Sequence, residues 1–330
     1  MFSIFSLLLV MSSLTELSSW TEDWYDAARE RSVPVRFFMP DSKVNQPPFP
    51  AVLLSHGLGG SREGFGYLGQ ALAENGYIAA VMQHTGSDIN LRFTRKSGET
   101  SLQAMSRAAN ADEAKQRYED VKFVLAELEK RNSENNKTEK HSLAGQINFD
   151  RIGIGGHSFG SQTAFAAAGR LPYRHIEKIK AAVVMSPNTP KNVSPALVHK
   201  NIAIPLLHLT GTDDRSPLDK SFDPKDRRIP FDNITGAEQY LVIFDGGTHL
   251  LFSGHRRLFG TTAMEKKCQP VIAEIITLFF DVYLKEDENA KRKIQNGKIN
   301  ELMKTLGTVE KKLQFQQQTQ QPQSSTANGL

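Results

Sequence analysis

Cysteine is almost absent from this 330-residue sequence, in which Cys268 is the only one. A single cysteine excludes an intrachain disulfide and any metal site built from cysteines. A strong excess of charge is also missing, because 40 basic residues face 36 acidic ones and the net charge is +4. No basic stripe with interleaved aromatic residues occurs, so nucleic acid is not an expected partner. Long apolar runs are missing too, and residues 4–11 form a stretch too short to span a bilayer.

The two ends of the chain differ in composition from the rest. Residues 4–11 could serve as the apolar core of a signal peptide, but no positive charge precedes them and no small-residue cleavage site follows. A signal peptide or disordered leader over residues 1–20 therefore leaves export and a cytoplasmic location both open. Residues 314–330 are dominated by Gln, Ser and Thr, a composition that predicts a disordered tail. We expect one domain over residues 21–313.

Apolar periodicity predicts strands alternating with helices across this central region. Short apolar runs indicate strands at residues 33–38, 51–55, 77–82, 151–154, 181–185, 204–209 and 240–244. Helical patterns occur at 63–75, after 110, at 161–169 and at 271–283. The alternation predicts an α/β fold with a mostly parallel sheet and helices on both faces. In such sheets the site lies beyond the carboxyl ends of the strands.

Three segments carry more specific expectations. Pro34 lacks an N–H group, which favours an edge position for the strand at 33–38. Residues 83–110 are polar and irregular, and we expect a long loop at the mouth of the site. The mixed charges of residues 223–228 are typical of a solvated surface.

The segment Gly156-His157-Ser158-Phe159-Gly160 has the pattern G-x-S-x-G between a predicted strand and a predicted helix. A strand-to-helix turn this sharp strains the central residue, and its flanking glycines let the neighbouring chain approach without a clash. This turn, the nucleophile elbow, presents the Ser158 hydroxyl at the end of the sheet. Ser158 is therefore the candidate nucleophile; a glycine-rich turn with an uninvolved serine is the alternative.

A serine nucleophile needs a base, usually a histidine oriented by a carboxylate. His249 follows the last predicted strand directly, in a glycine-containing turn that we expect to be flexible. His255 lies six residues further on and is the rival. We favour His249, because the last strand must deliver the base to the elbow.

The acid should follow the preceding strand, where Asp213 and Asp214 are both available. An acid three residues past the turn glycine, here Gly211, is the commoner arrangement and favours Asp214. Asp213 remains the alternative acid, and either carboxylate could instead cap its own turn.

An oxyanion hole requires backbone N–H groups that point at the developing charge. The residue after the nucleophile, Phe159, supplies one of them in this arrangement. The second should come from the loop Ser55-His56-Gly57-Leu58-Gly59-Gly60 after an early strand, with Leu58 as the donor.

Three segments together resemble the α/β-hydrolase superfamily: residues 55–60 (the oxyanion loop), the elbow, and Gly247-Thr248-His249. More narrowly, the chain is similar to predicted dienelactone hydrolases and plasma-type platelet-activating-factor acetylhydrolases over residues 26–284. The resemblance implies a serine ester hydrolase without a cofactor, in which Leu58 and Phe159 line the oxyanion hole.

Two departures from these families stand out. Dienelactone hydrolases proper use a cysteine nucleophile, whereas this elbow holds Ser158. The acetylhydrolases take their acid from the loop after the strand that follows the elbow, and here residues 186–190 contain no carboxylate.

These observations predict hydrolysis of a small-molecule carboxylic ester with a small or moderate acyl group, through Ser158, His249 and Asp214. Lactonase, polyesterase and acetylhydrolase activities are specialisations of the same site. A non-catalytic binding protein on this fold is the alternative from another class. No metal or cofactor is expected, and the oligomeric state stays open.

Overall fold

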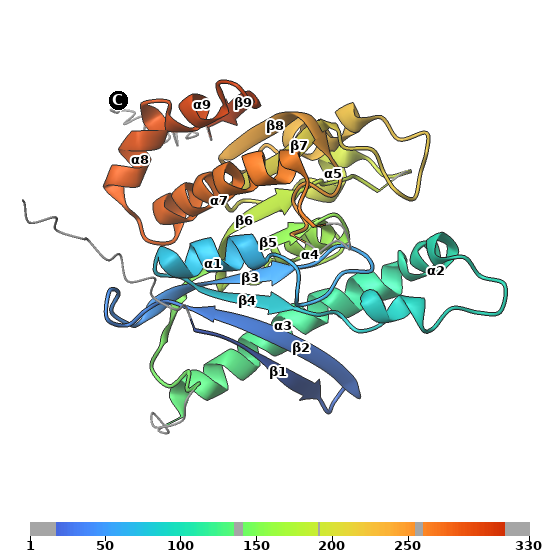
Figure 1. The fold of residues 1–330 in the computed structure, drawn as a ribbon, viewed down its shortest axis with the longest axis horizontal. Helices are drawn as coiled ribbons and strands as arrows, with labels where there is room; N and C mark the ends of the chain where they lie inside the picture. Colours follow the sequence, from blue (N-terminus) through green and yellow to red (C-terminus); the bar gives the residue numbers. More distant parts are fainter. Residues whose placement is uncertain (1–17, 135–140, 191, 255–259, 314–330) are drawn as a thin grey trace, which may run out of the picture.

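The computed structural model describes residues 18–134, 141–190, 192–254 and 260–313. Within them nine strands form one sheet in the order β1-β2-β4-β3-β5-β6-β7-β8-β9 (Figure 1). The six central strands run parallel, and they are β3 (Phe49–Ser55), β4 (Ile78–Met82), β5 (Ile147–His157), β6 (Ile179–Met185), β7 (Leu206–Asp213) and β8 (Gln239–Thr248). All seven predicted strands are present, and the predicted mostly parallel sheet is confirmed.

Antiparallel strands complete both edges of the sheet. β1 (Ser18–Asp26) pairs with β2 (Arg31–Met39), which pairs with β4, and β9 (Gly307–Lys312) pairs with β8. The predicted edge position of the strand at 33–38 is therefore wrong, because β1 covers that side. Pro34 precedes Val35, the first residue of β2 that pairs with β4, and it contributes only its carbonyl, which accepts from the Gln83 N–H at 2.8 Å.

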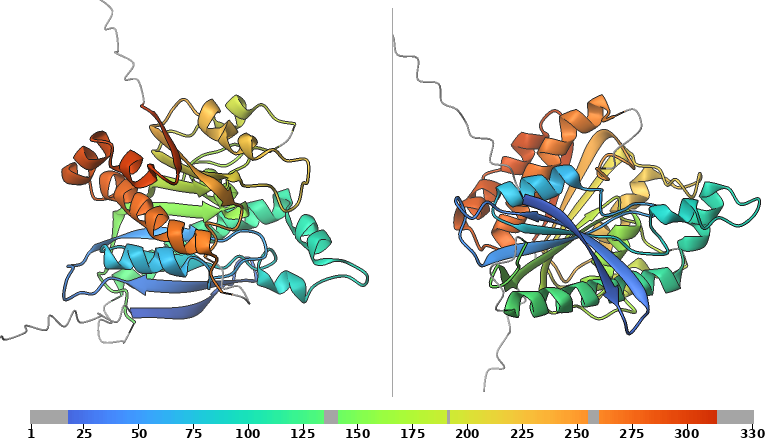
Figure 2. Two further views of the ribbon diagram at one scale, coloured as in Figure 1. Left: turned by 45° about the horizontal axis from the view of Figure 1, so that its top comes forward. Right: turned by 60° about the horizontal axis from the view of Figure 1, so that its bottom comes forward.

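Helices cover both faces of the sheet, as expected (Figure 2). On one face α1 (Gly66–Glu74) packs on α7 (Ala263–Tyr283), followed by α8 (Glu288–Gln295) and α9 (Lys298–Met303). The other face carries α3 (Ala111–Ser133) and α4 (Phe159–Ala167). This packing creates two buried apolar clusters, one between the sheet and each of the two helical layers. Burial from both sides explains why the central strands are continuously apolar.

Residues 83–110 contain more structure than the predicted loop. They form the 3₁₀ turn η1 (Ile89–Arg92) and the helix α2 (Ser101–Ala108). A capping box starts α2, because the Thr100 hydroxyl accepts from the Gln103 N–H while the Gln103 side chain accepts from the Thr100 N–H. Figure 1 shows α2 projecting beyond the carboxyl ends of β3 and β4.

Other short elements follow the elbow. They are α5 (Pro195–His199), the 3₁₀ turn η2 (Pro224–Arg228) and α6 (Ile229–Asn233). No helix in the described ranges is long and apolar enough to cross a membrane. Most of the predicted leader, the whole predicted tail and the rival base His255 lie outside the described residues. The domain limits at 21 and 313 thus stay predictions.

Candidate active site

Ser158 occupies a strained turn between β5 and α4, with φ 55° and ψ −114°. Its N–H donates to the Met185 carbonyl of the neighbouring strand at 2.9 Å. The turn is possible only with glycine on both sides. A Cβ at Gly156 would lie 2.0 Å from the Gly160 oxygen, and a Cβ at Gly160 would lie 1.9 Å from the Ser55 oxygen. Positive φ at a non-glycine residue is strained, and the conformation persists only because the surrounding sheet and helix hold it in place.

Three side chains from three strand ends form a continuous hydrogen-bonded chain. His249 Nε2 lies 2.9 Å from Ser158 Oγ, and His249 Nδ1 lies 2.7 Å from Asp214 Oδ1. The predicted nucleophile, base and first-choice acid are therefore adjacent in space. This order of contacts is the geometry that an activated serine requires.

Asp214 is fully buried, while Asp213 is exposed at the end of β7. The second carboxylate oxygen of Asp214 accepts from the Thr210 hydroxyl at 2.9 Å. Burial on its own would raise the pKa of Asp214, but the hydrogen bond from His249 and the charge of Arg227 together lower it. The carboxylate therefore stays ionised beside the imidazole at neutral pH. Asp213 makes no such contact with His249.

Arg227 is a site residue that the sequence did not reveal. Its Nη2 donates to Asp214 Oδ1 at 3.2 Å, and its Nη1 donates to the carbonyls of Ser186 and Pro187 at 3.1 and 3.3 Å. The residue is only 3% exposed, so the predicted solvated surface at residues 223–228 is wrong at this position. The mixed charges of this segment did not indicate a buried residue. Arg227 is buried, whereas its neighbours Lys225 and Asp226 in the same 3₁₀ turn are exposed.

His249 stands on a more regular support than the predicted flexible turn. β8 continues through Thr248, and a register shift opposite Gly211 lets the two strands stay paired up to Asp213 and Thr248. The His249 carbonyl lies 2.6 Å from His157 Nε2, which fixes the backbone beside the elbow. The base is thus held from both its ring and its main chain.

The two residues predicted to supply the oxyanion donors line the same cavity as Ser158. Leu58 follows β3, and Phe159 begins α4 directly after the nucleophile. Within the described parts of the chain, neither backbone N–H donates a hydrogen bond. Gly57 packs so closely that a Cβ there would lie 3.3 Å from Ser158 Cβ. Two unused donors beside a serine hydroxyl can receive a carbonyl oxygen.

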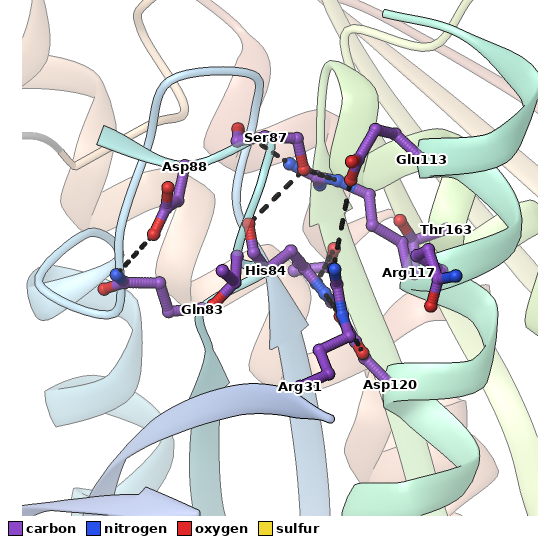
Figure 3. A network of polar contacts seen from close by, with 12 residues as sticks. Arg31, Gln83, His84, Ser87, Asp88, Glu113, Arg117, Asp120 and Thr163 are labelled. Carbon is purple, nitrogen blue, oxygen red and sulfur yellow. Dashed lines mark hydrogen bonds and ion pairs between the residues drawn. The ribbon is translucent and has the colours of Figure 1, made fainter. Parts of the chain in front are cut away.

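A buried polar network contacts the oxyanion loop, and Figure 3 shows its members His84, Arg117 and Asp120. Arg117 on α3 is fully buried, and its Nη1 donates to the His56 carbonyl at 2.6 Å. Its Nε donates to the Ser87 hydroxyl at 2.9 Å, and its guanidinium lies 4.4 Å from the Phe159 ring centroid. One side chain therefore contacts both segments that carry the predicted oxyanion donors. No motif or periodicity in the sequence pointed to Arg117.

Further along the same network, His84 joins Ser55 to Asp120. His84 Nε2 lies 2.9 Å from Ser55 Oγ, and His84 Nδ1 lies 2.9 Å from Asp120 Oδ2. Burial, together with the charge of Arg117, lowers the pKa of His84 to about 4. Burial alone would raise the pKa of Asp120, but the hydrogen bonds from His84 and Arg31 lower it to about 2. The histidine is therefore neutral and the carboxylate ionised at neutral pH.

A cavity of about 670 Å³ opens onto Ser158 and His249. Its wall combines apolar and small polar side chains from the oxyanion loop, α2, the segment after α4 and the segment after β7. Met105 and Ala109 contribute from residues 83–110, so this segment does lie at the mouth of the site. In the described ranges no group of three His, Cys, Asp or Glu side chains could hold a metal ion.

The sheet order and the elbow between β5 and α4 are those of the α/β-hydrolase fold, and comparison with known proteins agrees with that fold. Residues 34–187 match the family model of platelet-activating factor acetylhydrolase, isoform II. The match includes the oxyanion loop and Ser158 but ends before Asp214 and His249. It confirms the resemblance to this family of hydrolases. No curated protein sequence matches the chain.

A solved structure shows the same fold. It is a ferulic acid esterase from Streptomyces cinnamoneus, with a TM-score of 0.61 and 19% sequence identity. The alignment covers 84% of this chain and 92% of that chain. The predicted α/β-hydrolase fold is therefore confirmed over most of the length.

Proposed function

We propose that this chain is a serine hydrolase that cleaves carboxylic esters through an acyl-enzyme. The observation that carries the proposal is the unbroken contact from Ser158 Oγ through His249 to Asp214, at 2.9 and 2.7 Å, on a strained elbow that faces a cavity. The family match to acetylhydrolases over residues 34–187 supports the reaction class.

In the first half-reaction Ser158 Oγ attacks the ester carbonyl carbon, and His249 Nε2 takes the hydroxyl proton. Asp214 accepts from Nδ1–H, holds this tautomer and stabilises the imidazolium as it forms. The carbonyl oxygen becomes an oxyanion held by the N–H groups of Leu58 and Phe159. The carbon–oxygen bond to the alcohol then breaks, and His249 returns the proton to the leaving alkoxide.

In the second half-reaction water replaces the alcohol. His249 takes a proton from the water as its oxygen bonds to the acyl carbon, and the same two N–H groups hold the second oxyanion. Collapse breaks the bond to Ser158, the proton returns to Oγ, and the acid is released. The chain's own side chains supply every proton transfer.

The cavity favours small to moderate esters over long-chain lipids. Its volume of about 670 Å³ lies within the range of small-molecule sites. Acetyl to hexanoyl esters should therefore be hydrolysed better than palmitoyl esters. Lactones, polyesters and acetylated alcohols are further substrates that the same apparatus could process.

The test is turnover of p-nitrophenyl esters from acetate to palmitate by the wild type and Ser158→Ala, with a fluorophosphonate probe as an independent label. We expect turnover and labelling in the wild type and neither in the variant. Folded wild-type protein that neither turns over an ester nor takes the label would support a non-catalytic binding protein instead.

A further inference from the structure

Arg170, at the wall of the cavity, is a buried cation without a counter-ion. The residue is 5% exposed and lines the cavity that contains Ser158. Its Nη1 donates to Gln162 Oε1, but its Nε is buried without an acceptor. No carboxylate of the described residues lies within ion-pair distance of the guanidinium. An unpaired buried charge is costly, so its presence at a cavity calls for an explanation.

The two other buried arginines of the described residues have an acceptor at Nε. Arg227 pairs with Asp214 at 3.2 Å, and its Nε donates to the Asp214 carbonyl at 3.1 Å. Arg117 has no carboxylate at ion-pair distance, but its Nε donates to the Ser87 hydroxyl at 2.9 Å and it does not line the cavity. Arg170 instead has an amide partner in Gln162 and an aromatic one in Phe165, whose ring centroid lies 5.8 Å from its Cζ. Burial lowers the pKa of Arg170 to about 10, so the side chain remains charged at neutral pH.

The cavity wall offers no acid that could balance this charge. Among its described lining residues the charged ones are Arg170 and Arg227, with no Asp or Glu. Since Asp214 already neutralises Arg227, the positive charge left to the cavity is that of Arg170. An occupant with one negative charge would complete the site.

Arg170 is also linked, through Gln162, to the helix that begins at the reacting serine. Its partner Gln162 follows Ser158 by four residues on α4, which corresponds to ~6 Å along the helix. Gln162 is itself fixed, because its Nε2 donates to the Asn188 carbonyl at 2.9 Å. A group bound at Arg170 would therefore share one cavity with an ester carbonyl at Ser158.

We propose that Arg170 forms a subsite for a carboxylate, and that the preferred substrates are esters carrying a free carboxylate a few atoms from the ester carbonyl. This inference rests on the proposed esterase function and adds the substrate class. A carboxylate there would give the guanidinium the anionic acceptor it lacks, and a charge-assisted hydrogen bond in a buried site discriminates strongly against a neutral group.

A structural role makes a different prediction. Arg170 follows the C-terminus of α4, where a cation interacts favourably with the helix dipole. In that role the charge of the substrate would be irrelevant. The selectivity between charged and neutral esters therefore separates the two roles.

The experiment compares p-nitrophenyl hydrogen glutarate with p-nitrophenyl methyl glutarate, which differ in one capped carboxylate. The wild type should favour the charged ester in kcat/KM, and Arg170→Met should reduce this preference roughly 10- to 100-fold. Arg170→Lys should retain part of it. Arg174→Met is the matched control, because Arg174 is exposed, lies outside the cavity wall and carries the same charge. An unchanged preference in Arg170→Met would overturn the subsite.

Binding tests the subsite without turnover. Glutarate should bind wild-type protein and Ser158→Ala in calorimetry, whereas neutral glutaramide should not, and Arg170→Met should lose glutarate binding. If neither ester is hydrolysed but this pattern holds, the esterase proposal fails and the anion site stands. If esters are hydrolysed and glutarate binds no better than glutaramide, the subsite fails alone. Binding of inorganic phosphate in place of glutarate would overturn the choice of a carboxylate.

The comparison of glutarate with glutaramide on the wild-type protein tests the subsite even if Arg170→Met does not fold. Removing an unpaired buried charge should leave the Tm of Arg170→Met unchanged or higher. A large fall in Tm would instead favour the structural role.

Discussion

Two chains of hydrogen bonds with the order serine, histidine, aspartate run through the described part of this molecule. Ser158–His249–Asp214 meets the cavity, and Ser55–His84–Asp120 lies beneath the oxyanion loop. Their contact distances are alike, between 2.7 and 2.9 Å. Contact geometry within such a chain therefore does not define a catalytic site.

The difference lies in what surrounds each serine. Ser55 is the last residue of β3 and has no exposed surface, and His84 and Asp120 are equally buried. Ser158 stands on a strained turn beside two unused N–H groups and a cavity of about 670 Å³. A nucleophile needs access and a place for the oxyanion, and only the Ser158 chain provides both within the described residues. The buried chain instead connects the end of β3 and the segment after β4 to α3.

The largest expected effect is the contrast between the two serines. Ser158→Ala should reduce ester turnover by ~10⁴-fold or more, because the nucleophile is lost. Ser55→Ala should leave kcat/KM within about tenfold of the wild type but cost about 1–3 kcal/mol of stability, since His84 loses a buried partner. Ester kinetics and urea unfolding of both variants measure the contrast. Comparable losses of turnover in both would contradict the assignment.

The neighbouring carboxylates Asp213 and Asp214 should differ by almost as much. Asp214→Asn removes the charge that orients His249 and should reduce kcat by ~10³–10⁴-fold. Asp213→Asn is the matched control, because its side chain is exposed at the end of β7 and has no contact with the base. Steady-state kinetics at neutral pH measure both. A loss confined to Asp213→Asn would reverse the roles, and equally mild losses would mean that another group orients His249.

Arg117 should have a smaller effect, because it acts through the backbone of the oxyanion loop. Arg117→Met removes the contacts with the His56 carbonyl and the Phe159 ring, and misplacement of one oxyanion donor lowers kcat by up to ~10²–10³-fold. The fall should appear in kcat more than in KM, since the oxyanion exists only after attack. Lys115→Met, an exposed loss of the same charge on α3, is the control. A change in stability alone, with kcat unaltered, would make Arg117 purely structural.

Local patterns in the sequence were sufficient to predict the central sheet and the candidate positions Ser158, Asp214 and His249. Each of these lies directly after an apolar strand, and the parallel arrangement brings strand ends together without knowledge of distant contacts. The choice between Asp213 and Asp214 matches the structure, in which Asp214 is fully buried and Asp213 is exposed.

What the sequence could not reveal depends on tertiary contacts. Arg117, Arg170 and Arg227 read as ordinary surface charges, and only the packing of α3, α4 and η2 buries them. β1 was missed because its sequence SSWTEDWYD is polar at an exposed sheet edge. β9 is short and charged, and its strand conformation comes from pairing with β8. These elements obtain their structure from neighbours rather than from their own pattern.

The smallest expected effect is the dependence of the free energy of unfolding on acid pH, and it comes from the buried His84. The pKa of His84 falls from 6.5 to about 4 on folding, so the unfolded chain binds more protons between these values. Stability must then decrease as the pH falls from 6.5 toward 4, by roughly 1.4 kcal/mol per pH unit for this residue. His84→Gln keeps polar atoms but cannot be protonated in this range. It should be less stable at pH 7, and its stability should decrease less steeply with acid.

A second variant separates this titration from damage to the network around Arg117. His208→Gln lies in β7, where burial lowers the pKa of the histidine to about 3, and it should reduce the acid slope in the same way. Urea unfolding of the wild type and both variants between pH 7 and pH 4.5 measures the slopes. Equal slopes in all three proteins would show that neither histidine is held neutral by burial. A reduced slope in His208→Gln alone would mean that His84 accepts a proton in the folded protein, with Asp120 as the adjacent carboxylate that favours it.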